Sequence, residues 1–120
     1  MTRKTRTLGG RKGSQRKELS VARLGELIEE ATVDAHDESE MTTGFYTMFE
    51  EHLAVPFTTE VLGVEVTVER VDMTDDEQIV AVCERSGSRQ RIPIADLSLP
   101  DPPPKGAEWI DAYRRWARGR

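Results

Sequence analysis

The hydrophobic period of the chain changes at Pro56, and this change limits the possible folds more than any other feature of the sequence. Before Pro56, apolar residues recur at offsets of three and four, whereas over residues 64–71 valines mostly alternate with polar residues. The first spacing indicates amphipathic helices, and the second indicates strands that bury one face. The residue before a proline disfavours the helical backbone region, so the helical part has to end there. The sequence therefore predicts an α+β fold in which helices precede an antiparallel sheet.

Two helices are expected before Pro56. We predict the first over residues 18–31, where leucines recur at mostly helical offsets although Gly25 weakens the helix. We predict the second over residues 39–54, where Phe45 and Phe49 lie four residues apart on one face. Acidic residues in the first turn of the second helix complement the helix dipole. Both helices should present an apolar face to the rest of the domain.

Short strands separated by turns should follow over residues 57–98. A long half-buried strand, a polar turn, a buried strand, a tight turn at Gly87 and a third strand ending at Pro93 succeed one another. Such sequentially adjacent strands, closed by a single helical turn, predict a small SH3-like antiparallel β-barrel. A proline-rich extended spacer follows, and then an amphipathic C-terminal helix is expected over residues 105–118. The aromatic stripe of this helix should pack against the barrel.

The charge of the chain is distributed unevenly along its length. The 120 residues carry a net charge of −5, and we expect one domain over residues 17–120 behind a disordered basic tail over residues 1–16. Residues 26–84 hold 17 acidic side chains and one basic side chain, whereas residues 1–25 hold eight basic and one acidic. A segment of this acidity repels itself, and the repulsion favours a cation that lies among the carboxylates.

Other features of the sequence argue against several classes of function. Cys83 is the only cysteine, so we expect no intramolecular disulfide and no thiolate-rich metal site. Cys83, His36 and His52 also lack the close paired spacing of a zinc site. We find neither a glycine-rich phosphate loop nor a nucleophile elbow, and we expect no enzymatic activity. No apolar stretch approaches the ~18 residues of a membrane span, so we expect no membrane contact. The single cysteine favours a reducing compartment, and we expect a cytoplasmic protein.

The densest acidic cluster lies between the two expected helices. Its carboxylates are hard oxygen ligands of the kind that Ca²⁺ takes at about 2.3–2.6 Å, whereas Mg²⁺ demands stricter geometry and keeps its waters. The spacing is not that of an EF-hand, because counting from Asp34 puts Ser39 where that loop needs glycine and Phe45 where it needs glutamate. We therefore predict a calcium site of another shape. Its candidate ligands are Asp34, Asp37, Glu38 and Glu40, together with Glu50 and Glu51 from the second helix.

A simpler interpretation of the same acids remains open. They can form a solvated loop and the first turn of a helix, where carboxylates serve solubility and the helix dipole. Composition does not decide between the two interpretations. A second acidic cluster, Asp72 with residues 75–77, falls in a predicted turn, and there we favour the solvated turn because aspartate is common in turns.

Three short motifs link the acidic cluster to a known family. They are Val-Asp-Ala-His-Asp-Glu-Ser-Glu at residues 33–40, Gly-Phe-Tyr at residues 44–46, and Glu-Glu-His-Leu at residues 50–53 followed by Pro56 and Phe57. In these motifs the chain resembles the small bacterial calcium-binding family typified by the cyanobacterial protein CcbP, and the resemblance extends over residues 31–118. It implies a calcium buffer or sequestering protein with an SH3-like core and no catalytic activity. It also implies that Asp34, Asp37, Glu38 and Glu40 bind the ion, with Glu50 or Glu51 from the adjoining helix.

An interaction module is the alternative function. In this hypothesis the barrel face binds a protein or a nucleic acid, and the basic tail attracts phosphates without regard to sequence. The tail cations are Arg3, Lys4, Arg6, Arg11 and Lys12. The acidic middle of the chain would repel a polyanion, and the strands lack the interleaved aromatic residues of a base-stacking surface. Calcium binding, as a buffer or a sensor, is therefore the leading hypothesis.

Overall fold

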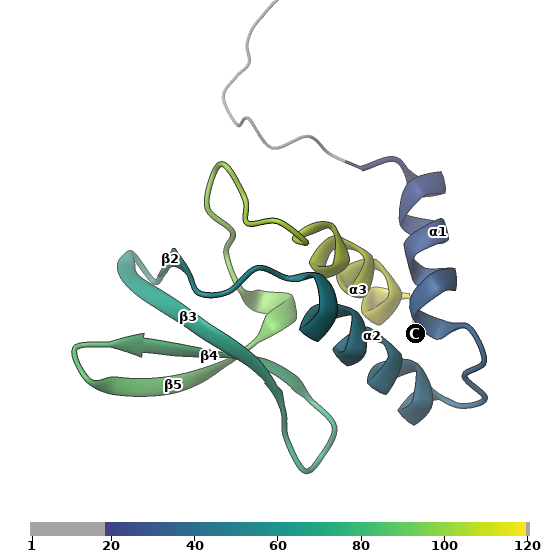
Figure 1. The fold of residues 1–120 in the computed structure, drawn as a ribbon, viewed down its shortest axis with the longest axis horizontal. Helices are drawn as coiled ribbons and strands as arrows, with labels where there is room; N and C mark the ends of the chain where they lie inside the picture. Colours follow the sequence, from purple (N-terminus) through teal and green to yellow (C-terminus); the bar gives the residue numbers. More distant parts are fainter. Residues whose placement is uncertain (1–18, 120) are drawn as a thin grey trace, which may run out of the picture.

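The computed structural model describes residues 19–119 as three helices beside one antiparallel sheet (Figure 1). In chain order the elements are α1 (Val21–Thr32), α2 (Glu38–His52), β2 (Phe57–Val61), β3 (Val64–Met73), β4 (Ile79–Arg85), β5 (Ser88–Pro93), the 3₁₀ turn η1 (Ile94–Asp96) and α3 (Glu108–Arg118). This arrangement confirms the α+β class. The predicted basic tail over residues 1–16 lies outside the described residues. None of the described helices is both long and apolar enough to cross a membrane.

The helix boundaries differ from the predicted ones for local reasons. α1 begins at Val21 because Ser20 caps it, with the hydroxyl oxygen accepting a hydrogen bond from the Arg23 amide at 3.0 Å. α2 ends at His52, and Leu53 already has an extended backbone ahead of Pro56. α3 begins at Glu108, later than predicted, because the chain turns through Gly106 at a φ of +90°.

The main core lies where α2 and α3 meet. Phe45 and Phe49 of α2 are fully buried, and their rings contact Tyr113 of α3 at centroid distances of 5.3 and 5.8 Å. Phe45 also packs on Trp116 at 5.2 Å. The aromatic stripe of α3 therefore packs mainly on α2, whereas the sequence predicted that it packs on a barrel. α1 covers the other side of this helix pair, and α2 also packs against β3.

The prediction of a closed SH3-like barrel is not confirmed, because the described strands form an open sheet in the order β2-β3-β4-β5. After β5 the chain forms η1 and then a segment that contains four prolines, which have no amide hydrogen for a strand ladder. A hydrogen bond links this segment to β2, since the Thr59 hydroxyl donates to the Ser98 carbonyl oxygen at 2.6 Å. The curled sheet therefore approaches closure without a ladder between β2 and β5.

Candidate functional site

The loop between α1 and α2 uses its acids to begin a helix. Asp37 is the N-cap of α2, and its Oδ1 accepts a hydrogen bond from the Glu40 amide at 2.8 Å. Glu40 reaches back, and its Oε1 accepts from the His36 amide at 2.6 Å. This reciprocal pattern resembles a capping box and satisfies amides that the helix itself leaves unpaired. Asp34 precedes it with a φ of +66°, a left-handed conformation that aspartate tolerates.

The six predicted ligands are spread over both ends of α2. Glu50 and Glu51 follow Glu38 by more than three helical turns, which is a rise of at least about 18 Å along the axis at 1.5 Å per residue. All ligands of one calcium ion lie within about 5 Å of one another, because each is within about 2.6 Å of the ion. Glu50 accepts instead from the hydroxyl of Tyr46, and Glu51 lies 3.8 Å from Nε2 of His52. The six carboxylates therefore do not form a single site in this conformation.

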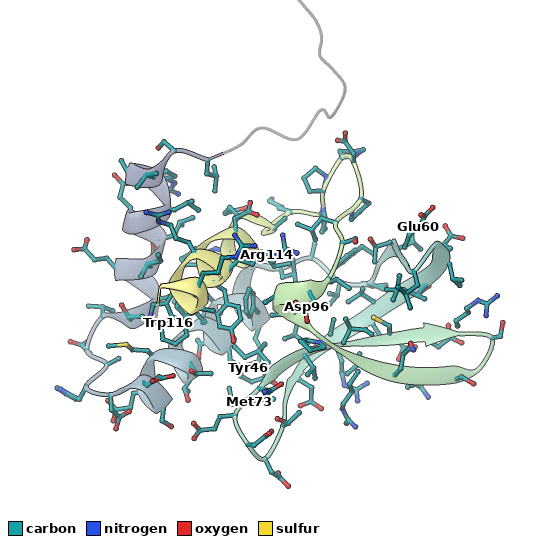
Figure 2. The ribbon with its side chains drawn as sticks, turned by 180° about the vertical axis from the view of Figure 1, so that it is seen from behind. Tyr46, Glu60, Met73, Asp96, Arg114 and Trp116 are labelled. Atoms are coloured by element: carbon teal, nitrogen blue, oxygen red, sulfur yellow. The ribbon has the colours of Figure 1, made fainter. Side chains whose placement is uncertain are left out.

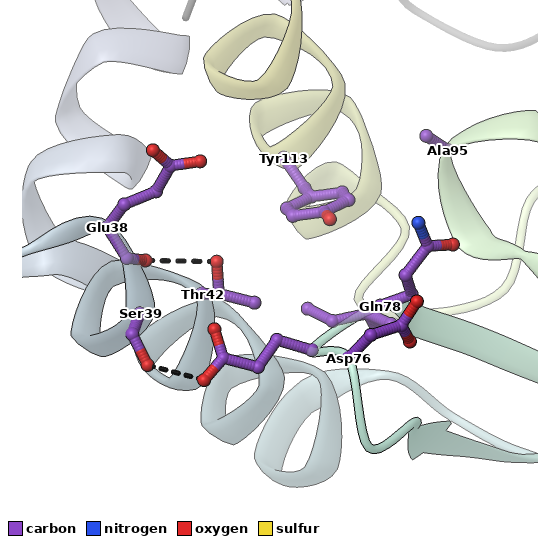
Figure 3. Close-up of a pocket in the computed structure, with 9 residues that line it drawn as sticks. Glu38, Ser39, Thr42, Asp76, Gln78, Ala95 and Tyr113 are labelled. Carbon is purple, nitrogen blue, oxygen red and sulfur yellow. Dashed lines mark hydrogen bonds between the residues drawn. The ribbon is translucent and has the colours of Figure 1, made fainter.

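The structure instead brings together two acidic clusters that are far apart in the sequence. The first turn of α2 faces the turn between β3 and β4 across a pocket of about 330 Å³ (Figure 3). Ser39 donates its hydroxyl to Oε2 of Glu77 at 2.7 Å, across 38 residues of chain. The pocket is lined by Glu38, Ser39, Thr42, Asp76, Glu77, Gln78, Ile79, Ala95 and Tyr113. The interpretation of residues 75–77 as an isolated solvated turn overlooked this contact, because no local pattern in either segment signals it.

Side-chain hydrogen bonds hold the β3–β4 turn in shape. The Thr74 hydroxyl donates to Oδ1 of Asp76 and accepts from the Gln78 amide at 3.0 Å. Glu77 takes a φ of +66°, which turns the chain back toward β4. On the facing helix, the buried Thr42 hydroxyl donates to the carbonyl oxygen of Glu38 at 3.0 Å. Both walls of the pocket are therefore organised by hydroxyl groups of threonine.

The donor set of this pocket suits calcium, but its carboxylates do not yet converge. Carboxylate, hydroxyl and amide oxygens are the ligands that Ca²⁺ prefers, and the pocket offers all three. Figure 3 shows the carboxylates of Glu38 and Asp76 on different sides of the pocket. Over residues 19–119, no group of three or more acidic, histidine or cysteine side chains is close enough to hold a metal ion. Binding at this pocket therefore requires side-chain rotation.

Both tyrosines of the chain lie near the acidic surfaces and have raised pKa values. Burial raises the pKa of Tyr113, which lines the pocket. The pKa of Tyr46 is raised by burial, by its hydrogen bond to Glu50 and by the charges of Glu50 and Asp72, while Arg70 lowers it. Each tyrosinate would form in a poorly solvated or anionic environment, so both hydroxyls stay protonated at neutral pH.

We expect both tyrosines of the native protein to ionise above their ordinary pKa of 10.0 in an ultraviolet absorbance titration. The same chain unfolded in urea should ionise near 10.0. Because the folded pKa values are the higher ones, this contribution to stability is present below about pH 10 and is lost as the pH rises through them. Tyr46→Phe and Tyr113→Phe assign the two transitions. A native tyrosine that titrates at its ordinary pKa would contradict the assigned environment.

Comparison with known proteins identifies the family. The family model Calci_bind_CcbP, described as calcium binding, matches residues 26–117, from α1 to the last turn of α3. No curated protein and no solved structure matches the chain. The matched span covers about three quarters of the sequence, including both acidic clusters, and it confirms the resemblance seen in the sequence motifs. The chain belongs to the CcbP calcium-binding family.

Proposed function

We propose that the protein binds Ca²⁺ in the pocket between the first turn of α2 and the β3–β4 turn, with Glu38, Asp76 and Glu77 as its carboxylate ligands. Family membership supports calcium as the ion. The observation that carries the location is the Ser39–Glu77 hydrogen bond, which joins the two acidic clusters at one pocket. The proposed site keeps one carboxylate of the sequence-predicted loop, Glu38, and replaces the others by acids of the turn.

Electrostatic attraction favours the binding of calcium at this pocket. Residues 26–84 carry 17 acidic side chains and one basic side chain, so the pocket lies in the most anionic part of the chain. A divalent cation relieves repulsion among carboxylates that line the same pocket. Hydroxyl and amide oxygens of Ser39, Thr42 and Gln78 are available to extend the coordination toward the six to eight oxygens of Ca²⁺. The smaller Mg²⁺ fits such an irregular set less well.

We further propose a buffering role rather than a sensing role. Ser39 and Glu77 already hold α2 against the β3–β4 turn without the ion. Binding then strengthens an existing contact and requires little change in the packing of helices and sheet. Calcium sensors work differently, since the ion opens a helix pair and exposes an apolar surface.

Calcium is expected to raise the melting temperature of the protein. A ligand present at 100 times its Kd stabilises the folded state by about 2.7 kcal/mol. For a domain of this size that corresponds to a rise of about 10 °C, measured by circular dichroism with Ca²⁺ against EDTA. Mg²⁺ should give a smaller shift. No shift with Ca²⁺, or an equal shift with both ions, would refute the proposed function.

Paired variants locate the site. Asp76→Asn combined with Glu77→Gln should abolish the calcium-induced shift, because it removes two of the three proposed carboxylates. Asp37→Asn is the control for the loop hypothesis, since asparagine caps a helix as well as aspartate does but carries no charge. It should leave the shift unchanged. Loss of the shift in Asp37→Asn but not in the turn variant would move the site back to the loop over residues 34–40.

A further inference from the structure

The tip of the β2–β3 hairpin carries a leucine, Leu62, that does not pack in the core and does not suit the backbone conformation of the turn. Leu62 is 98% exposed, and Leu62 and Gly63 have φ values of +52° and +78°. Two positive φ values at a two-residue turn are typical of type I′ hairpins, which favour Asn-Gly or Asp-Gly. Leucine is unfavourable there both for its backbone conformation and for its contact with water.

An apolar cleft lies beside this leucine because the two hairpins of the sheet separate at their tips (Figure 1). The β3–β4 register begins at Thr67 opposite Glu84, so residues 64–66 pair with β2 alone. The cleft has a volume of about 420 Å³. Its apolar lining consists of Val61, Leu62, Val64, Val66 and Cys83. It is the open end of the smaller hydrophobic core, which contains Val66 and Cys83.

The two hairpins that bound the cleft carry opposite charges. Glu60 and Glu65 are directly opposite each other on the β2–β3 hairpin, and Figure 2 shows Glu60 near its tip. Like charges in this register destabilise a hairpin, and among the described residues neither carboxylate has an ion-pair partner. The rim of the cleft on the other hairpin carries Arg85 and Arg89, of which Arg89 donates to Glu69 at 2.8 Å.

We propose that the chain forms a symmetric dimer in which Leu62 of each copy inserts into the apolar cleft of the other. The projecting side chain and the cleft are neighbours on one surface, as a two-fold interface requires, because the same patch must contact itself. In this arrangement the acidic β2–β3 hairpin of one copy meets the basic β4–β5 hairpin of the other. The like-charge pair of Glu60 and Glu65 thereby gains cationic neighbours, and Leu62 leaves water.

We assign a second copy of the chain to the cleft because the exposed Leu62 and the apolar cleft that could receive it occur together on this chain. The cleft offers an apolar lining beside a rim that carries Arg85 and Arg89, and the hairpin tip presents Leu62 beside the carboxylates of Glu60 and Glu65. Two hairpin tips bury less surface than a permanent dimer does, so we expect a dimer that dissociates on dilution. The proposal does not depend on calcium, and its tests are made in EDTA.

Leu62→Asn separates association from folding. Asparagine suits the left-handed turn, so the variant should melt at the same or a higher temperature at a dilution where both proteins are monomeric. It should remain monomeric in sedimentation equilibrium up to about 1 mM, where a Kd of about 1 mM would still leave a large dimer fraction in the parent protein. Val33→Asn is the control, since Val33 is also exposed but lies in the α1–α2 loop.

Charge reversal tests the symmetry of the interface. Glu60→Arg with Glu65→Arg should abolish the homodimer, and so should Arg85→Glu with Arg89→Glu, because each places like charges at both contacts. An equimolar mixture of the two variants should form a heterodimer, in which both contacts are again between opposite charges. A parent protein that is monomeric at about 1 mM would overturn the proposal. A dimer that survives Leu62→Asn, or a mixture that does not associate, would overturn it as well.

Discussion

Gly106→Ala is expected to destabilise the protein by about 3–5 kcal/mol and to lower its melting temperature by more than about 10 °C. Gly106 has a φ of +90°, a conformation that costs an L-residue about 1–2 kcal/mol. A Cβ atom there would also lie 2.1 Å from the carbonyl oxygen of His52 and 2.7 Å from Cα of Leu53. The contact is with backbone at the end of α2, which cannot move without disturbing Phe49.

Gly87→Ala is the matched control for this variant. Gly87 has a similar φ of +82°, but no atom outside its chain neighbours lies within 4 Å of the position that its Cβ would take. The substitution should therefore cost only the conformational part, about 1–2 kcal/mol. Urea unfolding of both variants measures the difference. Equal losses of stability in the two variants would contradict the close approach of Gly106 to the end of α2.

Gly44→Ala should be almost as disruptive, although it lies in the middle of a helix where alanine is ordinarily favoured. A Cβ atom at this position of α2 would lie 2.0 Å from the carbonyl oxygen of Ala31 and 3.1 Å from its carbonyl carbon. The two helices would have to separate, and the separation would open the packing around Leu27 and Phe45. We expect a loss of about 3 kcal/mol or more in the free energy of unfolding.

Gly25→Ala should stabilise the protein, in contrast to Gly44→Ala. Gly25 is inside α1, and nothing lies within 4 Å of the position that a Cβ atom would occupy there. Alanine should raise the free energy of unfolding by about 0.5–1 kcal/mol through helix propensity alone. Gly25 and Gly44 both lie in helices. Urea unfolding of the two variants therefore compares the same substitution without and with a close neighbour. A stabilising Gly44→Ala would contradict the close packing of α1 on α2.

Most of the elements could be predicted because their signals are local. Phe45 and Phe49 fall on one face of α2 by spacing, and the valines of β3 alternate along the strand, so the helical and strand periods are visible in short windows. Boundaries required contacts that spacing does not report, such as the hydrogen bond from the Arg23 amide to Ser20. The single long strand expected ahead of the polar turn proved to be two strands, β2 and β3, joined by a turn at Leu62 and Gly63. The closed barrel was not confirmed either, since closure depends on how the chain runs after Pro93.

The candidate site was also predictable only in part. Acidity around Glu38 and around Asp76 is evident in the sequence, and the family motifs indicate calcium without any knowledge of the fold. The meeting of these two clusters through Ser39 and Glu77 was not predicted, because the hydrogen bond spans 38 residues and neither segment has a pattern that refers to the other. Asp37 and Glu40 also proved to cap a helix, a role that composition had left open.

By itself, the sequence determined the helices, the change to strands after Pro56, the segregation of charge and the family of this protein, since each depends on neighbouring residues or on a linear motif. The tertiary structure decided which acids share a pocket, that the sheet stays open, and why Gly44 and Gly106 have no substitute. These properties depend on distances between residues remote in the chain. Such distances are set by the packing of whole elements, in which a single Cβ atom or one missing amide hydrogen changes the outcome.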